Sequence, residues 1–286
     1  MASLLSVENL QVQFQTKKGI NTAVDGVSFS VEKGRILGIV GESGCGKSVT
    51  SMSILQLLGS NARISGGSIK LDGKELIGLP EKEMCRIRGN DIAMIFQDPM
   101  TALNPTLTIG TQLMEPIMLH QNCGKKEAWT RAVDVLKRVG IAAPEKRMKE
   151  YPHQLSGGMR QRVMIAMAVS CEPRLLIADE PTTALDVTIQ AQILELMCEL
   201  REKMGTAIML ITHDMGVVAE TADDVLVLYA GKAVEYGSIE DIFERPKHPY
   251  TQGLLNSIPR LDEDVELLNT IEGTVPAPDA MPAGCR

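Results

Sequence analysis

The fold is decided by the stretch Gly41-Glu-Ser-Gly-Cys-Gly-Lys47-Ser48. It follows the apolar, β-branched run Arg35-Ile-Leu-Gly-Ile-Val40, which is typical of a buried parallel strand. The glycines let the backbone bend so that consecutive N–H groups form an anion cradle. The lysine can then reach the β- and γ-phosphates, and a helix expected over residues 47–58 directs its N-terminal dipole at them. The pattern predicts a nucleotide-binding loop in an α/β fold.

An acidic pair, Asp179 and Glu180, stands at the end of a second buried run, Leu175-Leu-Ile-Ala178. Ligands of open α/β sheets bind at the carboxyl ends of the strands. Asp179 suits the outer shell of Mg²⁺, and Glu180 is placed to polarise an attacking water as a general base. Alone, such a pair is as often a solvent-facing strand end, but the phosphate loop favours the catalytic interpretation.

A second phosphate-binding surface is predicted at Leu155-Ser-Gly-Gly-Met-Arg-Gln-Arg162. Ser156 is a good N-cap for a helix expected over residues 159–171, and Gly157 and Gly158 leave its start uncovered. An ordinary capped helix has the same pattern, and only the acidic strand that follows favours an anion site. One chain has little use for two such surfaces at one nucleotide, so the motif indicates a pair of chains.

Two further polar residues follow strand-like runs. Gln97 ends the run at residues 92–96, and His213 follows the run at residues 207–212. Both are therefore expected at a carboxyl edge, with Gln97 near the metal. A lone glutamine is normally solvated and a lone histidine there is more often structural, so both interpretations depend on the other motifs.

Together these motifs resemble the ATPase subunit of an ATP-binding cassette (ABC) transporter over roughly the first 240 residues. The resemblance implies a P-loop NTPase ABC cassette with a RecA-like core, an antiparallel β-subdomain and a helical subdomain. ATP would lie between this chain's loop and a partner's Ser156-Gly157-Gly158 signature, with Glu180 as the catalytic base. His213 would contact the γ-phosphate, and Ala184-Leu185-Asp186 match the D-loop.

The resemblance also implies a set of site residues. The catalytic residues would be Glu180, His213 and Gln97, and the Mg²⁺ ligands Ser48, Gln97 and Asp179. The nucleotide would contact Phe14, Gly41, Glu42, Ser43, Gly44, Cys45, Gly46, Lys47, Ser48, Val49 and the signature residues Ser156, Gly157 and Gly158. Phe14 would stack on adenine, although a core phenylalanine is nearly as consistent with its position.

The chain is expected to hold one large domain, residues 1–237, with an extension over residues 238–286. Strands are expected over residues 4–14 and 22–31, joined across Lys17-Lys18-Gly19, and over residues 67–73 with an Asp-Gly turn. Further expected elements are a helical subdomain at about residues 99–160 with its clearest helix at 129–139, a helix at 187–203, and a hairpin at 225–236. The proline-rich extension is expected to form an extended strap outside the ATP chemistry.

The extension narrows the family. Residues 96–105, 151–156 and 245–259 resemble the dipeptide/oligopeptide permease ATPases, with the D-type dipeptide subunit as the nearest fit. In that group the tail continues into a cysteine-rich segment that can hold an iron–sulfur cluster. Here only Cys285 remains, so the chain is expected to be cut short and to bind no cluster. Importers of nickel and of antimicrobial peptides share this tail, which leaves the solute open.

The resemblance also implies partners. They are a second ABC ATPase, expected to be a paralogue in a heterodimer, two integral-membrane permease subunits and, indirectly, an extracytoplasmic peptide-binding protein. The chain is expected at the cytoplasmic face of the inner membrane. An apolar, methionine-bearing stretch at residues 100–120 is a hypothetical docking groove for a permease helix.

Composition agrees with these expectations and limits the alternatives. The net charge of −7 argues against nucleic acid as the main partner, and no run approaches the ~18–20 apolar residues that cross a bilayer. Six scattered cysteines suit a reducing compartment. A soluble ABC ATPase acting on DNA or ribosomes usually carries a coiled coil or two cassettes, which this chain lacks. A non-catalytic regulator would be favoured by a changed Glu180 or His213, and both are present.

Overall fold

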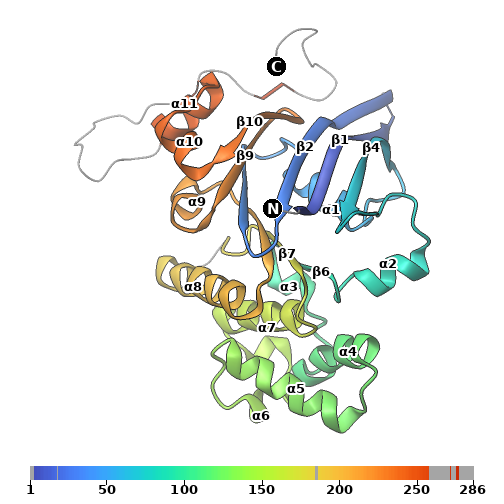
Figure 1. Ribbon diagram of the computed structural model, residues 1–286. Coiled ribbons are helices and arrows are strands. Elements are labelled where there is room, and N and C mark those ends of the chain that lie inside the picture. The colour runs from blue at the N-terminus through green and yellow to red at the C-terminus, as the bar shows by residue number, and fades with distance from the viewer. Residues whose placement is uncertain (1–2, 18, 184–185, 258–270, 272–274, 277–286) are drawn as a thin grey trace. The chain divides into compact units, whose positions relative to one another are not determined.

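Two units make up the chain in the computed structural model, which describes residues 3–17, 19–183, 186–257, 271 and 275–276 (Figure 1). The first unit combines Met1–Leu79 with Met209–Arg286, and the second unit is Pro80–Ile208. Strand β8 (Ala207–Ile211) carries the chain from the second unit back into the first. Lys18, at the tip of the predicted first hairpin, lies outside the described residues.

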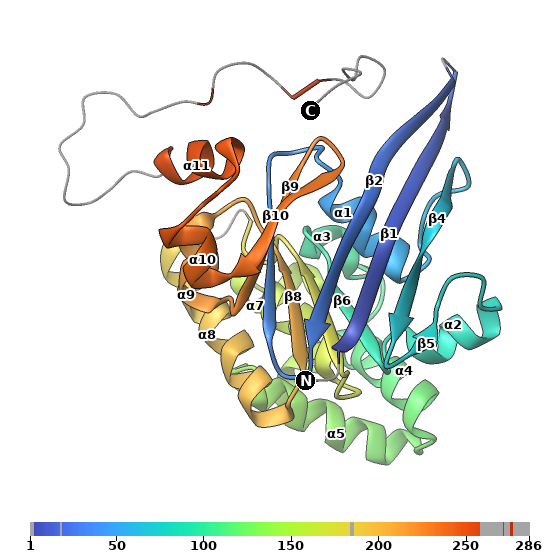
Figure 2. The same ribbon diagram turned by 45° about the horizontal axis from the view of Figure 1, so that its top comes forward.

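The first unit contains an antiparallel sheet with the strand order β2-β1-β4-β5 (Figure 2). Strands β1 (Ser3–Thr16) and β2 (Gly19–Glu32) pair along their length, and β4 (Ala62–Leu71) pairs with the other edge of β1. Asp72 and Gly73 turn the chain into the short strand β5 (Lys74–Glu75), both with positive φ. The predicted antiparallel strands are confirmed, and β4 begins five residues earlier than residue 67.

The strand before the phosphate loop is β3 (Ile36–Val40), and all five of its residues are buried. It pairs in parallel with β9 (Asp224–Tyr229), which forms the predicted hairpin with β10 (Lys232–Ser238). Ala230 and Gly231 make the turn, with φ of 47° and 83°. Two positive φ values in a two-residue loop match the right-handed twist of the flanking strands.

Helix α1 (Lys47–Ile54) follows the phosphate loop and is shorter than the expected 47–58. The prediction of its end was wrong because the chain turns at Gln56, whose φ is 50°. The side-chain amide of Gln56 donates to the carbonyl of Leu76, which holds this turn in place. Helix propensity alone carries no signal of that tertiary bond.

The extension begins with two helices, α10 (Ile239–Glu244) and α11 (Pro249–Asn256), which follow β10 in the first unit. The expected extended strap is therefore wrong over this part. Ser238 caps α10 by accepting from the Asp241 N–H at 3.2 Å, and Pro249 takes the first helical position of α11, where a proline costs no hydrogen bond. The rest of the extension lies outside the described residues, apart from residues 271, 275 and 276.

In the second unit, β6 (Ile92–Ile95) and β7 (Leu175–Asp179) pair in parallel. Helix α2 (Glu81–Ile87) precedes β6, and α8 (Val187–Met204) follows β7. The predicted strands at 92–96 and 175–178 and the predicted helix at 187–203 are confirmed within one or two residues. Asp186 begins α8 by accepting from the Ile189 N–H at 3.0 Å.

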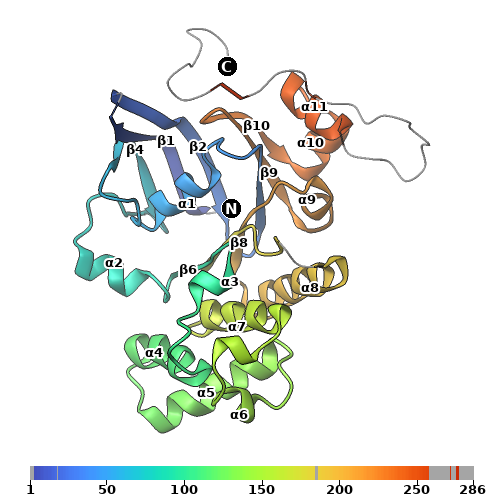
Figure 3. The same ribbon diagram turned by 180° about the vertical axis from the view of Figure 1, so that it is seen from behind.

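The chain between β6 and β7 forms further helices of the second unit (Figure 3). They are α3 (Pro99–Ala102), α4 (Ile109–Gln121), α5 (Lys125–Arg138), α6 (Pro144–Arg147), a 3₁₀ turn (Pro152–Gln154) and α7 (Gly157–Val169). Helices α4, α5 and α7 pack on one another, and Leu113, Ile117, Leu136 and Ile165 on these helices are fully buried. Among the described residues, we find no helix that combines the length and the apolar character needed to span a membrane.

Candidate functional site

The phosphate loop, residues 41–48, joins β3 to α1 and is shaped by its glycines. Gly41 has a φ of 145°, and a Cβ there would lie 2.1 Å from the carbonyl oxygen of Leu228. Gly46 has a φ of 108°, and its Cβ would lie 3.0 Å from the carbonyl oxygen of Ala23. Larger residues at either position would force the loop away from its neighbours, so this backbone path depends on glycine.

Lys47 is 6% exposed and turns back into the loop. Its Nζ donates to the carbonyls of Gly41, at 2.6 Å, and Glu42, at 3.0 Å. The ammonium is therefore held over the concave side of the loop. Helix α1 begins there with Gly46 as N-cap and with no side-chain cap, which leaves its N-terminal N–H groups available to an anion.

The other side chains of the loop differ in exposure. Ser43 and Ser48 are exposed, Val49 is half-buried, and the Cys45 thiol is buried. Burial raises the pKa of Cys45, and the nearby Lys47 only partly offsets this. The thiol therefore stays protonated at neutral pH, which agrees with a position that contributes its backbone.

The acidic pair ends β7 in the second unit. Asp179 is the last strand residue and is 6% exposed. Glu180 has a φ of 47°, a left-handed conformation that is uncommon for a residue with a long side chain. Its Oε2 accepts hydrogen bonds from Gln97 Nε2 at 2.9 Å and from Thr183 Oγ1 at 3.0 Å. The backbone strain and the two donors together fix the direction of the carboxylate.

The structure thus brings Gln97 and Glu180 together, although 83 positions separate them. Gln97 follows β6, and the parallel pairing of β6 with β7 places both residues beyond the same strand ends. The amide nitrogen of Gln97 faces Glu180, so its Oε1 is the atom available to a cation. An amide oxygen and a carboxylate are both hard oxygen ligands of the kind that Mg²⁺ prefers.

The Ser-Gly-Gly segment starts α7, where Ser156 Oγ accepts from the Met159 N–H at 3.4 Å. The helix begins at Gly157, two residues before the predicted start, because Ser156 is its N-cap. Gly157 is exposed, and a Cβ there would meet nothing within 4 Å, whereas one at Gly158 would lie 3.2 Å from Ile189. The helix start therefore faces open space.

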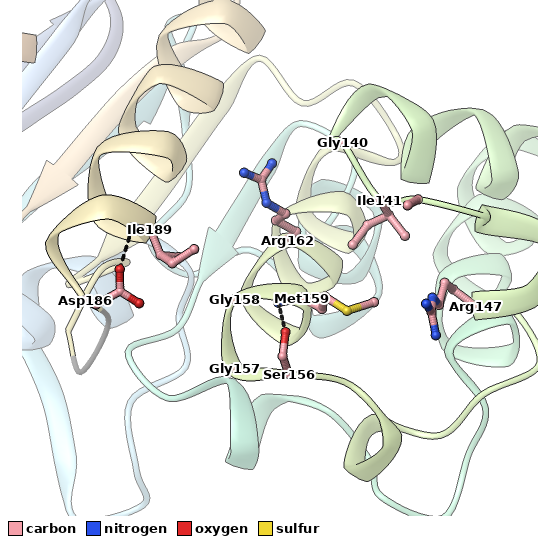
Figure 4. Close-up of a pocket in the computed structure, with 11 residues that line it drawn as sticks. Gly140, Ile141, Arg147, Ser156, Gly157, Gly158, Met159, Arg162, Asp186 and Ile189 are labelled. Carbon is pink, nitrogen blue, oxygen red and sulfur yellow. Dashed lines mark hydrogen bonds between the residues drawn. The ribbon is translucent and has the colours of Figure 1, made fainter.

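A cavity of about 580 Å³ lies over this helix start, entirely within the second unit (Figure 4). Arg162 lines it and donates to the carbonyl of Val139 at 2.7 Å and to Gln192 at 3.0 Å. Arg147 also lines it, and its charge is paired with Glu150 at 2.8 Å. The cavity thus combines an exposed helix N-terminus with two guanidinium groups, and the Asp186 carboxylate also lines it.

A buried contact connects the start of α7 to the acidic pair. Gln161 is 2% exposed, and its side-chain amide donates to the carbonyl of Pro181, the residue after Glu180. Both belong to the second unit. This bond joins the first turns of α7 to the segment that follows Glu180.

His213 and Phe14, two more of the predicted site residues, belong to the first unit. His213 is exposed between β8 and α9 (Met215–Thr221), next to Asp214, which caps α9. Phe14 is half-buried on β1, opposite Asn21 of β2 and Ala62 of β4. Ala184 and Leu185 of the predicted D-loop, and Cys285, lie outside the described residues.

Sequence reasoning missed two residues that touch the predicted site. Thr183 could have been noticed, since it comes three positions after Glu180 and carries a hydroxyl. Tyr250 of α11 accepts a hydrogen bond from the Glu42 N–H in the phosphate loop at 3.1 Å, across 208 positions of sequence. No local pattern indicates that contact, because only the folded chain brings the extension to the loop.

Comparison with known proteins identifies the class. A family model described as "ABC transporter" matches residues 24–183. An ATP-binding cassette solved as a dimer, in a post-hydrolysis state with ADP and phosphate bound, is similar at a TM-score of 0.74 and 27% identity, covering 82% of this chain and 98% of that one. The structure of cbiO1 from Clostridium perfringens, part of the ABC transporter complex cbiONQ, is similar at a TM-score of 0.73 and 28% identity, covering 86% of this chain and 92% of that one. The chain belongs to the ABC transporter family.

The C-terminal extension and the relatives of known name indicate which branch of the ABC transporter family the chain belongs to. A model described as "Oligopeptide/dipeptide transporter, C-terminal region" matches residues 234–286. The oligopeptide transport ATP-binding protein AppD of Bacillus subtilis is 58% identical, covering 100% of this chain and 88% of that protein. The oligopeptide transport ATP-binding protein OppD of Escherichia coli is 54% identical over 99% of this chain and 84% of that protein. The resemblance and the fold class inferred from the motifs are confirmed.

Proposed function

We propose that this chain is the ATP-hydrolysing subunit of an importer for dipeptides or oligopeptides. The observation that carries the proposal is the pairing of two features in one chain. A phosphate loop with an inward-held lysine occurs together with a C-terminal region that matches oligopeptide/dipeptide transporters. The names of the relatives, which are peptide transport ATP-binding proteins, support the solute class.

ATP is proposed to bind at residues 41–49. The loop backbone and the start of α1 would surround the phosphates, and Lys47 would exchange its bonds to the loop carbonyls for bonds to phosphate oxygens. Phe14 remains the proposed residue that stacks on adenine. The half-buried position of Phe14 on β1 leaves part of its ring available for that contact.

Mg²⁺ fits the chemistry of the proposed donor set. Ser48, Gln97 and Asp179 offer a hydroxyl, an amide oxygen and a carboxylate, all of them hard oxygen ligands. When bound, the ion would neutralise charge on the phosphates and orient them. Ser48 is exposed at the start of α1, so its hydroxyl is accessible.

Hydrolysis is proposed to depend on Glu180 as the general base. The donors Gln97 and Thr183 hold its carboxylate in one direction, as a base that must meet a water molecule requires. His213, exposed after β8, is proposed to contact the γ-phosphate. These roles are inferred from residue type and position.

The Ser-Gly-Gly surface is proposed to act on ATP held by a second ATPase. The open start of α7 and the cavity above it support a ligand that arrives from outside this unit. The similar cassette that was solved as a dimer supports the pairing. We propose a paralogue as the partner.

Two integral-membrane permease subunits are the proposed membrane partners, with an extracytoplasmic peptide-binding protein acting through them. The chain would then sit peripherally at the cytoplasmic face of the inner membrane. Leu107, Met118 and Leu119 are exposed apolar residues in the described part of the stretch at 100–120, and they are the proposed contact with a permease helix. Leu103, Leu113, Met114 and Ile117 are core.

The domain boundaries remain proposals as well. We propose the nucleotide-binding domain as residues 1–237, with the helical subdomain at about 99–160, and the peptide-permease extension as residues 238–286. The C-terminal family match that begins at residue 234 supports the second boundary.

The test is purification of the assembled complex from membranes, followed by measurement of phosphate release. Peptide presented by the binding protein should raise the rate of ATP hydrolysis. The Lys47→Ala variant should show no ATP hydrolysis, with or without peptide. Nickel ions serve as the comparison solute, since nickel importers resemble this tail. Stimulation by nickel and not by peptide would reject the proposed solute and leave the ATPase assignment standing.

A further inference from the structure

The extension touches the phosphate loop through one side chain. Tyr250 of α11 is 8% exposed, and its hydroxyl oxygen accepts from the Glu42 N–H at 3.1 Å. Both residues belong to the first unit. The nucleotide motifs are complete by residue 213, so this contact joins a segment outside them to the second residue of the loop.

The bonded peptide also contacts the lysine of the loop. The carbonyl of Glu42 accepts from Lys47 Nζ at 3.0 Å, while the N–H of the same residue donates to Tyr250. The Glu42 N–H shares its peptide plane with the Gly41 carbonyl, which accepts from Lys47 Nζ at 2.6 Å, so a bond that holds this N–H also holds that carbonyl. Tyr250 therefore limits how the loop presents Lys47 to an anion.

Tyr250 is itself firmly placed. Its ring packs on Tyr229 of β9 with the centroids 4.5 Å apart, and β9 carries Leu228, whose carbonyl lies close to Gly41. The carboxylate of Glu235 on β10 accepts from the N–H groups of Lys247, at 2.7 Å, and His248, at 3.1 Å, which fixes the chain just before α11. Burial raises the pKa of Tyr250, so the hydroxyl stays protonated at physiological pH.

We propose that Tyr250 is a positioning residue for ATP, through which helix α11 sets the nucleotide affinity of the phosphate loop. The inference rests on the proposed function, because it takes residues 41–49 as the ATP site. It also revises the expectation that the extension has no part in nucleotide binding. A partner that displaced α11 would thereby lower the affinity of the phosphate loop for ATP.

The test compares Tyr250→Phe with wild type by equilibrium titration of the full chain with ATP. Phenylalanine keeps the ring on Tyr229 and removes only the hydroxyl. Loss of one neutral hydrogen bond should raise the Kd for ATP about threefold to tenfold. Tyr236→Phe is the matched control, since its hydroxyl donates to the Ser30 carbonyl at 3.2 Å and not to the loop. Its Kd should stay within about twofold of wild type.

Two further readouts separate positioning from general destabilisation. In the assembled complex, Tyr250→Phe should raise the KM for ATP by the same factor and leave kcat within about twofold. Glu235→Gln weakens the bonds that hold the chain just before α11. Added to Tyr250→Phe, it should not raise the Kd for ATP any further, because both changes act through the Tyr250 hydroxyl. An unchanged Kd for Tyr250→Phe, with wild type binding ATP normally, would overturn this inference alone. A wild-type chain that bound no ATP would overturn the proposed function, and this inference with it.

Discussion

Replacement of Glu180 by glutamine removes the proposed base and keeps its shape. The glutamine carbonyl can accept the same bonds from Gln97 and Thr183, which measure 2.9 Å and 3.0 Å in the native protein. The backbone strain at φ 47° is the same for both side chains. The change in the free energy of unfolding should therefore stay within about 1 kcal/mol.

The effect on hydrolysis should be much larger. A positioned general base contributes roughly 10²–10⁴ in rate, which corresponds to about 2.7–5.4 kcal/mol of activation free energy. Binding of ATP should be equal or tighter, because the substitution removes a negative charge that repels the triphosphate. Thr183→Val is a graded control that removes one of the two donors, and it should slow hydrolysis by less than about tenfold because Gln97 still holds the carboxylate.

The assay is phosphate release by the assembled transporter, with the ATP Kd measured separately by titration. Glu180→Gln should lose most of its hydrolysis and retain its ATP binding. Hydrolysis at a near wild-type rate would refute the assignment of Glu180 as the base. A loss of ATP binding would show instead that the carboxylate supports the nucleotide site itself.

Three other substitutions test separate parts of the proposal. Gly157→Asp adds a negative charge where a Cβ meets nothing within 4 Å, so it should weaken ATP-dependent association of the two ATPases and leave ATP binding unchanged. The neutral Gly157→Asn is the control and should associate normally. Equal loss of association in both variants would reject the electrostatic reason. A cysteine introduced at Leu119, which is 69% exposed, should crosslink to a cysteine in a permease loop, whereas a cysteine at buried Leu113 should not. Crosslinks found only elsewhere on the chain would exclude residues 100–120 as the contact with the permease. Hydrogen bonds to the Glu235 carboxylate outweigh its desolvation and lower its pKa from 4.5, so Glu235→Gln should melt at a lower temperature than wild type at neutral pH. Protonation removes this contribution as the pH falls through the lowered pKa, so the melting temperatures should converge below pH 4.5, and a gap that persists there would contradict the sign.

Much of the central fold could be predicted because three of its strands are almost entirely apolar runs. Residues 36–40, 175–179 and 207–211 are buried at every position, and such runs read as central strands without further information. The phosphate loop and the helix start capped by Ser156 carry their own local chemistry. These signals depend on neighbours in sequence, so they can be read before the chain folds.

What could not be predicted depends on residues far apart in the sequence. Helix α1 stops early because Gln56 bonds to Leu76, and the direction of Glu180 depends on Gln97. Residues 249–256 form a helix because Pro246 precedes it and Pro249 takes its first position, whereas the density of prolines alone indicated an extended strap. The contact of Tyr250 with the loop follows from the packing of α11 in the first unit.

Uptake of a labelled dipeptide by vesicles containing the reconstituted transporter tests the central claim most directly. Uptake should require the binding protein and ATP on the side of the ATPases, and it should disappear in Lys47→Ala and in Glu180→Gln. Nickel uptake in the same vesicles is the comparison. ATP hydrolysis without dipeptide or oligopeptide uptake, or uptake that survives both substitutions, would contradict the conclusion that this chain powers peptide import.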